Sequence, residues 1–141
     1  MTTVAPRILP PLDDDNREFW TSGASGELHL PRCADCGRWV FPPARRCPDC
    51  SGSAAYAPVS GRGRVFTHSV SRHQFHPEVP VPFVIAIVEL VEQDGLRFTT
   101  NVVNCPIDAV TIDMPVRVVF EQHGDVFVPL FEPDPAGGTE Q

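Results

Sequence analysis

The sequence contains no lysine, and its arginines are too few to balance its acidic residues. Eleven Arg stand against eighteen Asp and Glu, which gives a formal net charge of −7 and argues against a general nucleic-acid binder. No apolar run reaches the eighteen or more residues that a transmembrane helix needs. The stretch "MTTVAPRILPP" also lacks the charged region and apolar run of a secretory signal. We therefore expect a cytoplasmic protein, with no membrane partner, whose cysteines stay reduced.

Motifs of the common catalytic sites are absent as well. There is no GxSxG, P-loop or GxGxxG pattern, and no nucleophile stands near an obvious base. His68, His73 and His76 in "THSVSRHQFHP" have no acidic partner at metal-ligand spacing, and Cys105 is a lone thiol before a proline. We expect no catalytic residues in this chain, and the roles of these four side chains stay open.

Four of the five cysteines stand in "RCADCGRWVFPPARRCPDC". Cys33, Cys36, Cys47 and Cys50 have the spacing C-x2-C-x10-C-x2-C, and each CxxC turn aims two thiolates at one point. Two such turns complete a tetrahedron that suits Zn²⁺, with Zn–S bonds of about 2.3 Å. Since all four positions are filled by protein, the pattern predicts a closed, structural zinc site. Iron in a rubredoxin-like site is the alternative, because the same four thiolates fit both metals.

Arginines crowd this cysteine-rich segment. Six Arg and three acidic residues lie between residues 27 and 64, whereas three Arg and eleven acidic residues follow. These arginines either offset the negative charge of a four-cysteine metal centre or form a patch for the phosphates of an anionic ligand. The aromatic residues among them either stack on a base of that ligand or pack the segment against its neighbouring domain. The predicted patch for CoA phosphates and adenine consists of Arg38, Trp39, Phe41, Arg45 and Arg46.

Runs of β-branched and aromatic residues predict a mainly β chain. The acidic residues before "EFW" predict a short helix over 14–21, and "ELHLPRC" predicts a strand before the first cysteine pair. Five further strands are predicted, with a helical turn at 106–110, over 62–73, 81–91, 96–104, 115–123 and 125–133. Five strands fit an OB-type barrel, while another small barrel or a sandwich has a similar strand count. The predicted division is an arm with a helix at 1–26, a zinc ribbon at 27–60, an OB-fold at 61–133 and a disordered tail at 134–141.

These motifs, in this order, resemble the DUF35 family over about residues 13–133. The motifs are R-C-x-x-C-G-x-x-x-F-P-P with C-P-x-C, then S-G-x-G-x-V, then M-P-V-x-V-x-F. The resemblance implies a rubredoxin-like zinc ribbon joined to a five-stranded OB-fold barrel, with the four cysteines as metal ligands. The chain departs from the family pattern at His68 and at Arg72–His73.

The resemblance also implies an accessory subunit rather than a free-standing enzyme. Members of the family pair with thiolase-like condensing enzymes, aldolases of the lipid-transfer-protein type or MaoC-type hydratases, for example in steroid or lipid catabolism. They are thought to help bind acyl-CoA. The resemblance therefore implies a hetero-oligomer, in which the partner subunit covers a hydrophobic face or edge of the barrel. Two alternatives are a single-stranded nucleic-acid binder, which the acidic barrel opposes, and a stand-alone thioester-handling enzyme that uses Cys105 or a histidine.

Overall fold

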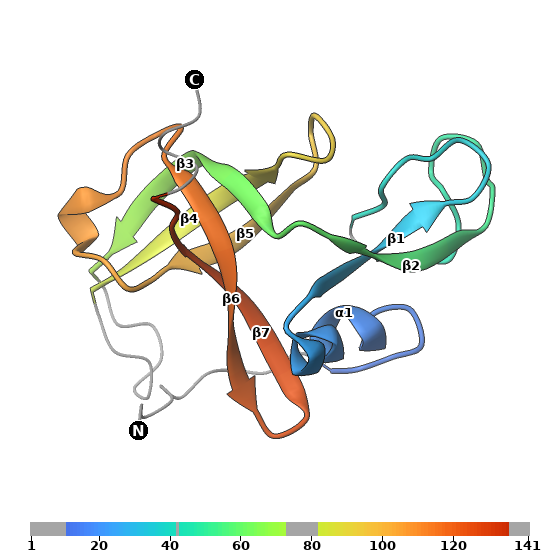
Figure 1. Ribbon diagram of the computed structural model, residues 1–141, viewed down its shortest axis with the longest axis horizontal. Helices are drawn as coiled ribbons and strands as arrows, with labels where there is room; N and C mark the ends of the chain where they lie inside the picture. The colour runs from blue at the N-terminus through green and yellow to red at the C-terminus, as the bar shows by residue number, and fades with distance from the viewer. Residues whose placement is uncertain (1–10, 42, 73–81, 136–141) are drawn as a thin grey trace.

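The computed structural model describes residues 11–41, 43–72 and 82–135, and Figure 1 shows two β units that follow one another along the chain. One unit is a two-stranded sheet that carries the cysteine turns, and the other is a closed five-stranded barrel. The elements in chain order are α1 Arg17–Thr21, η1 Ser22–Ser25, β1 Leu28–Cys33, β2 Ala54–Val59, β3 Arg62–Ser71, β4 Phe83–Leu90, β5 Arg97–Val102, η2 Ile107–Ala109, β6 Pro115–His123 and β7 Val126–Pro133. The predicted mainly β class is confirmed. No helix in the described ranges is long and apolar enough to cross a membrane.

The N-terminal helix is shorter than the sequence predicts. The Asp13 carboxylate accepts hydrogen bonds from the backbone N–H groups of Asp15, at 2.9 Å, and Asn16, at 2.8 Å. These bonds form an N-capped turn, in which the Arg17 N–H also donates to the Asp13 carbonyl at 3.0 Å. The regular helix α1 begins after this turn, at Arg17. Its one buried side chain, Phe19, packs edge-on against Phe98 of the barrel, with ring centroids 6.3 Å apart. The helix therefore ties the start of the described chain to the barrel wall.

The first unit is built on the antiparallel pair β1–β2. Leu28 pairs with Val59 at one end and Cys33 pairs with Ala54 at the other, so the cysteine turns lie at the end farthest from the barrel (Figure 1). The strand β1 was predicted from "ELHLPRC", but β2 was not. The segment "AAYAPV" has three alanines and a proline, and its strand geometry comes from pairing with β1 rather than from its own propensity.

The second unit is a barrel with the strand order β3-β4-β5-β7-β6, and β6 pairs back to β3. The strands β5 and β7 run parallel and are joined by one pair, Val102↔Phe131. All five predicted strands and the predicted helical turn, η2, are present, and this arrangement is the OB-fold that the sequence favoured. The prediction for β3 reached His73, which lies outside the described residues, as does His76.

The barrel core is formed by alternate residues of its strands. On β4, Val84, Ala86, Val88 and Leu90 are buried, so the intervening side chains point outward. The buried set continues on the other strands with Val65, Phe98, Val102, Val116 and Phe131. Because β4 reads "FVIAIVEL", its outward side is apolar as far as Ile87 and ends in Glu89.

Only Ser60 and Gly61 separate β2 from β3. Gly61 has a φ of +76°, and a Cβ there would lie 2.4 Å from a methyl group of Val118. Its carbonyl accepts a hydrogen bond from the Val118 N–H at 2.7 Å. The Ser60 N–H donates to the Glu92 carboxylate at 2.6 Å. The link between the two units is therefore short and fixed on both sides.

Candidate metal centre

The four cysteines predicted to bind metal come together at the outer end of the β1–β2 unit. Their Sγ atoms all lie within 4.8 Å of one another. The Cys33–Cys50 pair is 3.4 Å apart and the Cys36–Cys47 pair is 3.7 Å apart. Sulfur atoms at the corners of a tetrahedron with bonds of about 2.3 Å lie about 3.8 Å apart. The described cluster therefore has the size of a four-thiolate metal site.

The two CxxC turns repeat the same backbone hydrogen bonds. In the first, the Gly37 N–H donates to the Cys33 carbonyl at 3.1 Å, and in the second the Ser51 N–H donates to the Cys47 carbonyl at 3.0 Å. The equivalent residues Gly37 and Ser51 have left-handed φ values of +77° and +65°. Each turn thus folds back on itself in the same way, and both present their sulfur atoms to a common centre.

Backbone N–H groups point at the sulfur atoms of these turns. Cys33 Sγ accepts from the N–H groups of Asp35 and Cys36, each at 3.4 Å, and Cys47 Sγ accepts from Asp49 at 3.4 Å. The donor on Cys36 is the main reason that the pKa of Cys33 falls to about 7. Donors of this kind stabilise the thiolate, which is the form that binds metal. The turns thus favour the thiolate at Cys33. At Cys36 and Cys50 a backbone N–H also acts to lower the pKa, but the neighbouring cysteine side chains outweigh it and raise the pKa of both thiols.

Gly52 leaves room for the sulfur cluster. A Cβ at this position would lie 3.0 Å from Cys33 Sγ and 2.6 Å from an oxygen of Asp35. The backbone of the second turn therefore passes directly against the first turn. A side chain at this position would push the two halves of the site apart.

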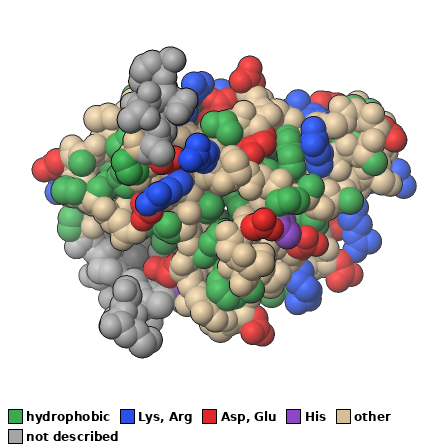
Figure 2. Space-filling model, in the orientation of Figure 1, with side chains coloured by type: hydrophobic (Ala, Val, Ile, Leu, Met, Phe, Trp, Pro, Cys, Tyr) green, Lys and Arg blue, Asp and Glu red, His purple; other side chains and the backbone are tan. Residues whose placement is uncertain are grey.

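The arginines of the predicted ligand patch interact with other parts of the chain. Arg38 pairs with Asp49 at 3.0 Å across the two cysteine turns. Arg46 donates to the Ser51 carbonyl at 2.9 Å, and Arg45 reaches the N-terminal segment, where it pairs with Asp15 at 2.7 Å. The three arginines therefore already have partners in the chain. Figure 2 shows such basic and acidic side chains interspersed around the ribbon side of the molecule.

The two aromatic residues of the patch pack the ribbon against the barrel. Trp39 is 7% exposed. The Phe41 ring lies 5.2 Å from Phe98 and 5.5 Å from Phe19, centroid to centroid. This is the packing role that the sequence analysis gave as the alternative to stacking on a ligand. A contact of these five residues with CoA stays a prediction.

A glutamine of the barrel fixes the position of Trp39. The backbone N–H of Trp39 donates to Gln93 Oε1 at 2.8 Å, and Gln93 Nε2 donates back to the backbone carbonyl of Trp39 at 3.1 Å. Gln93 lies in the turn between β4 and β5, 54 residues along the chain. Sequence reasoning missed this contact, because nothing in "EQDG" distinguishes a side chain that clamps a distant backbone from one that faces solvent.

His68 and the fifth cysteine, Cys105, lie apart from the sulfur cluster. His68 is half-buried on β3, and its Nδ1 atom has no hydrogen-bond partner among the described residues. Cys105 is half-buried, and this burial raises the pKa of its thiol. A raised pKa lowers the thiolate fraction near neutral pH and with it the reactivity of the sulfur.

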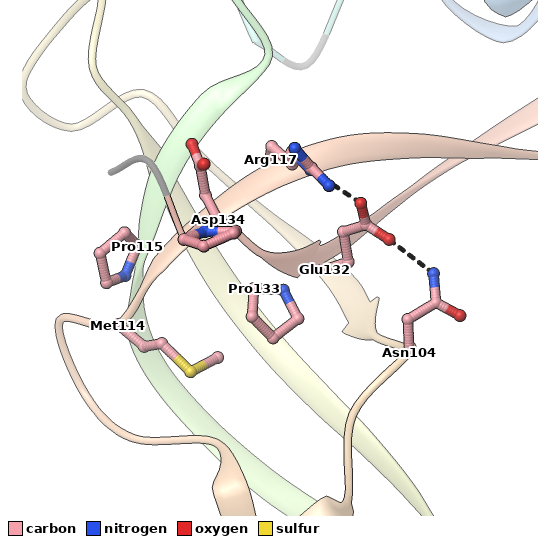
Figure 3. A pocket seen from close by; sticks show the side chains of 8 residues that line it. Asn104, Met114, Pro115, Arg117, Glu132, Pro133 and Asp134 are labelled. Carbon is pink, nitrogen blue, oxygen red and sulfur yellow. Dashed lines mark hydrogen bonds and ion pairs between the residues drawn. The ribbon is translucent and has the colours of Figure 1, made fainter. Parts of the chain in front are cut away.

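One hollow at the end of the barrel is lined by charged side chains that satisfy one another. In Figure 3 the Glu132 carboxylate lies between Arg117, at 2.7 Å, and Asn104, at 2.6 Å. The amide of Asn104 and the guanidinium of Arg117 hold the pKa of Glu132 below its usual range. Nearby, Asp134 is 4% exposed and pairs with Arg62 at 3.7 Å. These contacts hold the final strand, β7, in place. The ordered contacts extend to Asp134, one residue past the predicted end of the barrel at 133.

Comparisons with known proteins agree with this architecture. Residues 20–57 match a family described as "ChsH2, rubredoxin-like zinc ribbon domain", and residues 56–121 match one described as "ChsH2, C-terminal OB-fold domain". The solved structure "Ltp2-ChsH2(DUF35) aldolase" aligns with a TM-score of 0.79 and 31% identity, covering 89% of this chain and 98% of that chain.

Two curated relatives extend the comparison. A "DUF35 domain-containing scaffold protein" of Methanocaldococcus jannaschii is 38% identical over 96 residues, which are 64% of this chain and 65% of that protein. A "Probable enoyl-CoA hydratase alpha subunit" of Thermomonospora curvata is 36% identical over 138 residues, or 94% of this chain. The present chain spans only 42% of the length of that hydratase subunit. With its paired cysteine turns and its barrel, the chain belongs to the DUF35 family of ChsH2-type proteins, in which a rubredoxin-like zinc ribbon is joined to an OB-fold.

Proposed function

We propose that this chain is a non-catalytic accessory subunit that binds a thiolase-like partner and helps to form or stabilise the acyl-CoA site of that partner. The observation that carries the proposal is the alignment with nearly the whole of a chain from the structure named as an Ltp2-ChsH2 aldolase. The relative named as a scaffold protein supports a non-catalytic role. A hydratase partner is the second candidate, supported by the relative named as a hydratase subunit.

The proposed resident metal is Zn²⁺, held by Cys33, Cys36, Cys47 and Cys50. Sulfur separations of 3.4 and 3.7 Å fit a tetrahedral ion of this size. When bound, the ion would supply folding free energy to the ribbon, and four protein ligands would leave it no open position for a substrate. Elemental analysis of the purified protein tests the assignment. One equivalent of zinc supports the assignment. Iron, together with a visible thiolate charge-transfer absorption, would instead assign a rubredoxin-like iron site.

Within this proposal, Arg38, Arg45 and Arg46 are the candidates for contact with CoA phosphates. The side chains of Arg38 and Arg45 are 44% and 69% exposed, and their carboxylate partners are exposed as well. Exposed ion pairs of this kind are weak, so a guanidinium can exchange its carboxylate for a phosphate. Trp39 and Phe41 would then act as the rigid support behind these arginines.

Co-expression with a candidate thiolase-like protein from the same genome tests the proposed function. The expected result is a complex that survives size-exclusion chromatography and turns over acyl-CoA faster than the partner alone. Absence of a complex with that protein, together with unchanged partner activity, would overturn the proposal. A matched titration with single-stranded DNA at low salt separates it from the nucleic-acid alternative, for which tight binding is expected.

A further inference from the structure

One face of the barrel is apolar on the outside. On β4, the buried residues alternate with Phe83, Ile85 and Ile87, which therefore point away from the core. Ile85 is 37% exposed, and Phe66 on the neighbouring strand β3 is 41% exposed. The strands β3, β4 and β5 lie side by side, so these residues share one outer surface.

This surface continues into a hollow of about 520 Å³ between β5, β7 and the N-terminal helix. Ile85 and Thr99 stand at the edge where the two meet, and the aromatic rings of Phe19, Trp20 and Phe41 line the opposite wall. No charged side chain lines the hollow within the described part of the chain. The outer face of β4 and this hollow are together called the apolar face.

The apolar face differs from the other hollows of the barrel in its charge. The hollow in Figure 3 is lined by Arg117, Glu132 and Asp134, and a third one by Arg64, Glu89 and two aspartates. A hollow without a cation has nothing to hold the phosphates of CoA or of a nucleic acid. The occupant that suits the apolar face is therefore uncharged and hydrophobic.

The rim of the apolar face is polar and already organised. The Arg97 guanidinium lies 3.8 Å from the centroid of the Phe66 ring, and it also pairs with the buried Glu89 at 3.8 Å. Because Arg97 is held by both groups, it fixes the exposed ring in place and is not available to follow a phosphate backbone. An apolar centre with a preorganised polar rim is the composition of a protein–protein interface.

We propose that the apolar face is the surface on which a protein partner docks, with an apolar segment of that partner seated against Ile85 and in the hollow. This inference rests on the proposed function, and the partner it fits is the thiolase-like subunit. A protein fits better than a small ligand, because ligand sites enclose most of their ligand, while this hollow opens onto the exposed side chains of β3 and β4.

The test measures, by calorimetry, the affinity of the purified chain for the thiolase-like protein used in the co-expression experiment. Ile85→Glu and Phe66→Glu place a charge on the apolar face, and each is expected to weaken Kd about tenfold or more. Val91→Glu and Ile112→Glu are the matched controls, because these residues are 69% and 60% exposed and do not line the hollow. Both controls are expected to bind within about twofold of the wild type, as substitutions outside an interface do. Zinc content and melting temperature verify that each variant is folded.

A photo-crosslinking amino acid at Thr99 gives a second reading that does not depend on a disruptive charge. A crosslink to the thiolase-like subunit from position 99, and none from position 91, supports the inference. If the wild-type chain binds that subunit but Ile85→Glu and Phe66→Glu bind equally well, the inference fails and the proposed function stands. If the wild-type chain binds no such subunit, both fail. A crosslink to a second copy of the chain, or Ile85-dependent binding of octanoyl-CoA to the chain alone, would assign the face to a different occupant and overturn the inference.

Discussion

The ribbon and the barrel are held together by different interactions. The barrel buries a continuous set of apolar side chains, among them Val65, Val88 and Phe131, each with no exposed surface. In the outer ribbon, over residues 43–58, Cys47 is the one hydrophobic side chain that the structure describes as buried. Apolar burial contributes about 25 cal/mol per Å², so the barrel can stabilise itself while the outer ribbon cannot. The comparison gives the proposed metal a structural role in one unit only.

The largest expected effect comes from removing a metal ligand. We expect Cys33→Ser to lose the metal and unfold the ribbon, because metal binding contributes on the order of 10 kcal/mol in zinc modules. The barrel should keep its fold, with backbone chemical shifts of β4 and β5 little changed. Cys105→Ser is the control, since Cys105 lies outside the sulfur cluster. Full zinc content in Cys33→Ser would contradict the assignment of the site.

Truncation of the barrel core should have the opposite distribution. Phe131 has no exposed surface, so Phe131→Ala is expected to cost about 3–5 kcal/mol. Denaturant unfolding followed at the barrel should show this loss, while zinc content at 25 °C stays at one equivalent. Val91→Ala, at a residue that is 69% exposed, is the control and should have little effect. Loss of zinc from folded Phe131→Ala would show that the two units are not separately stabilised.

Gln93 provides a way to weaken the connection between the two units. Gln93→Ala removes both hydrogen bonds to the Trp39 backbone. Leaving this buried N–H without a partner is expected to cost about 1–3 kcal/mol. Calorimetry should then show that the ribbon unfolds at a lower temperature than the barrel. The control is Asp94→Ala, at the next position, which is exposed; it should keep the wild-type transition. Identical transitions in both variants would show that the clamp does not couple the units.

Ser51 tests the likeness of the two cysteine turns. Ser51 adopts a φ of +65° where the first turn has Gly37 at +77°. Relief of this left-handed strain, partly offset by the greater chain entropy of glycine, should make Ser51→Gly more stable by about 1 kcal/mol or less. Gly37→Ala should be destabilised by a similar amount. Zinc affinity measured by competition with a chelator checks both, and a large loss in Ser51→Gly would mean that its side chain has a further role.

The smallest effect concerns the contact of the helix with the ribbon. Partial burial works to lower the pKa of His29, but hydrogen bonds to Glu18, at 2.9 Å, and Glu27, at 3.3 Å, outweigh it and raise the pKa above 6.5. A raised folded-state pKa gives stability that is complete below pH 6.5 and is lost as the pH rises through the folded-state value. Exposure of both carboxylates keeps the effect below about 1 kcal/mol. A stability profile from pH 5.5 to about 8 that has the same slope in His29→Gln would contradict this account.

The sequence predicted the features that depend on short spacing or on residue alternation. The CxxC spacing identified the four cysteines that the structure brings together, and the runs after Cys50 identified all five barrel strands. It did not predict β2, because "AAYAPV" becomes a strand only through its partner β1. It also did not predict the Gln93 clamp, which joins residues 54 positions apart.

The apolar face shows a different limit of the sequence. In "FVIAIV", residues 83–88, both sets of alternate residues are apolar, so alternation cannot show which set enters the core. The resemblance implied a hydrophobic face or edge covered by a partner, without naming a strand. The fold decides this by burying Val84 and Ala86 and leaving Ile85 exposed.

The short link between β2 and β3 has a mechanical consequence. Gly61 is hydrogen-bonded to Val118 and leaves no room for bending toward it, and Ser60 is bonded to Glu92. The base of the ribbon is thus fixed to the barrel, and the sulfur cluster lies at the opposite end of the ribbon. A displacement of that end is therefore transmitted to the barrel by rotation about Gly61, whereas a flexible linker would not transmit it. In a subunit bound to both the ribbon and the barrel, a tilt of the ribbon would therefore change the contacts at the barrel wall.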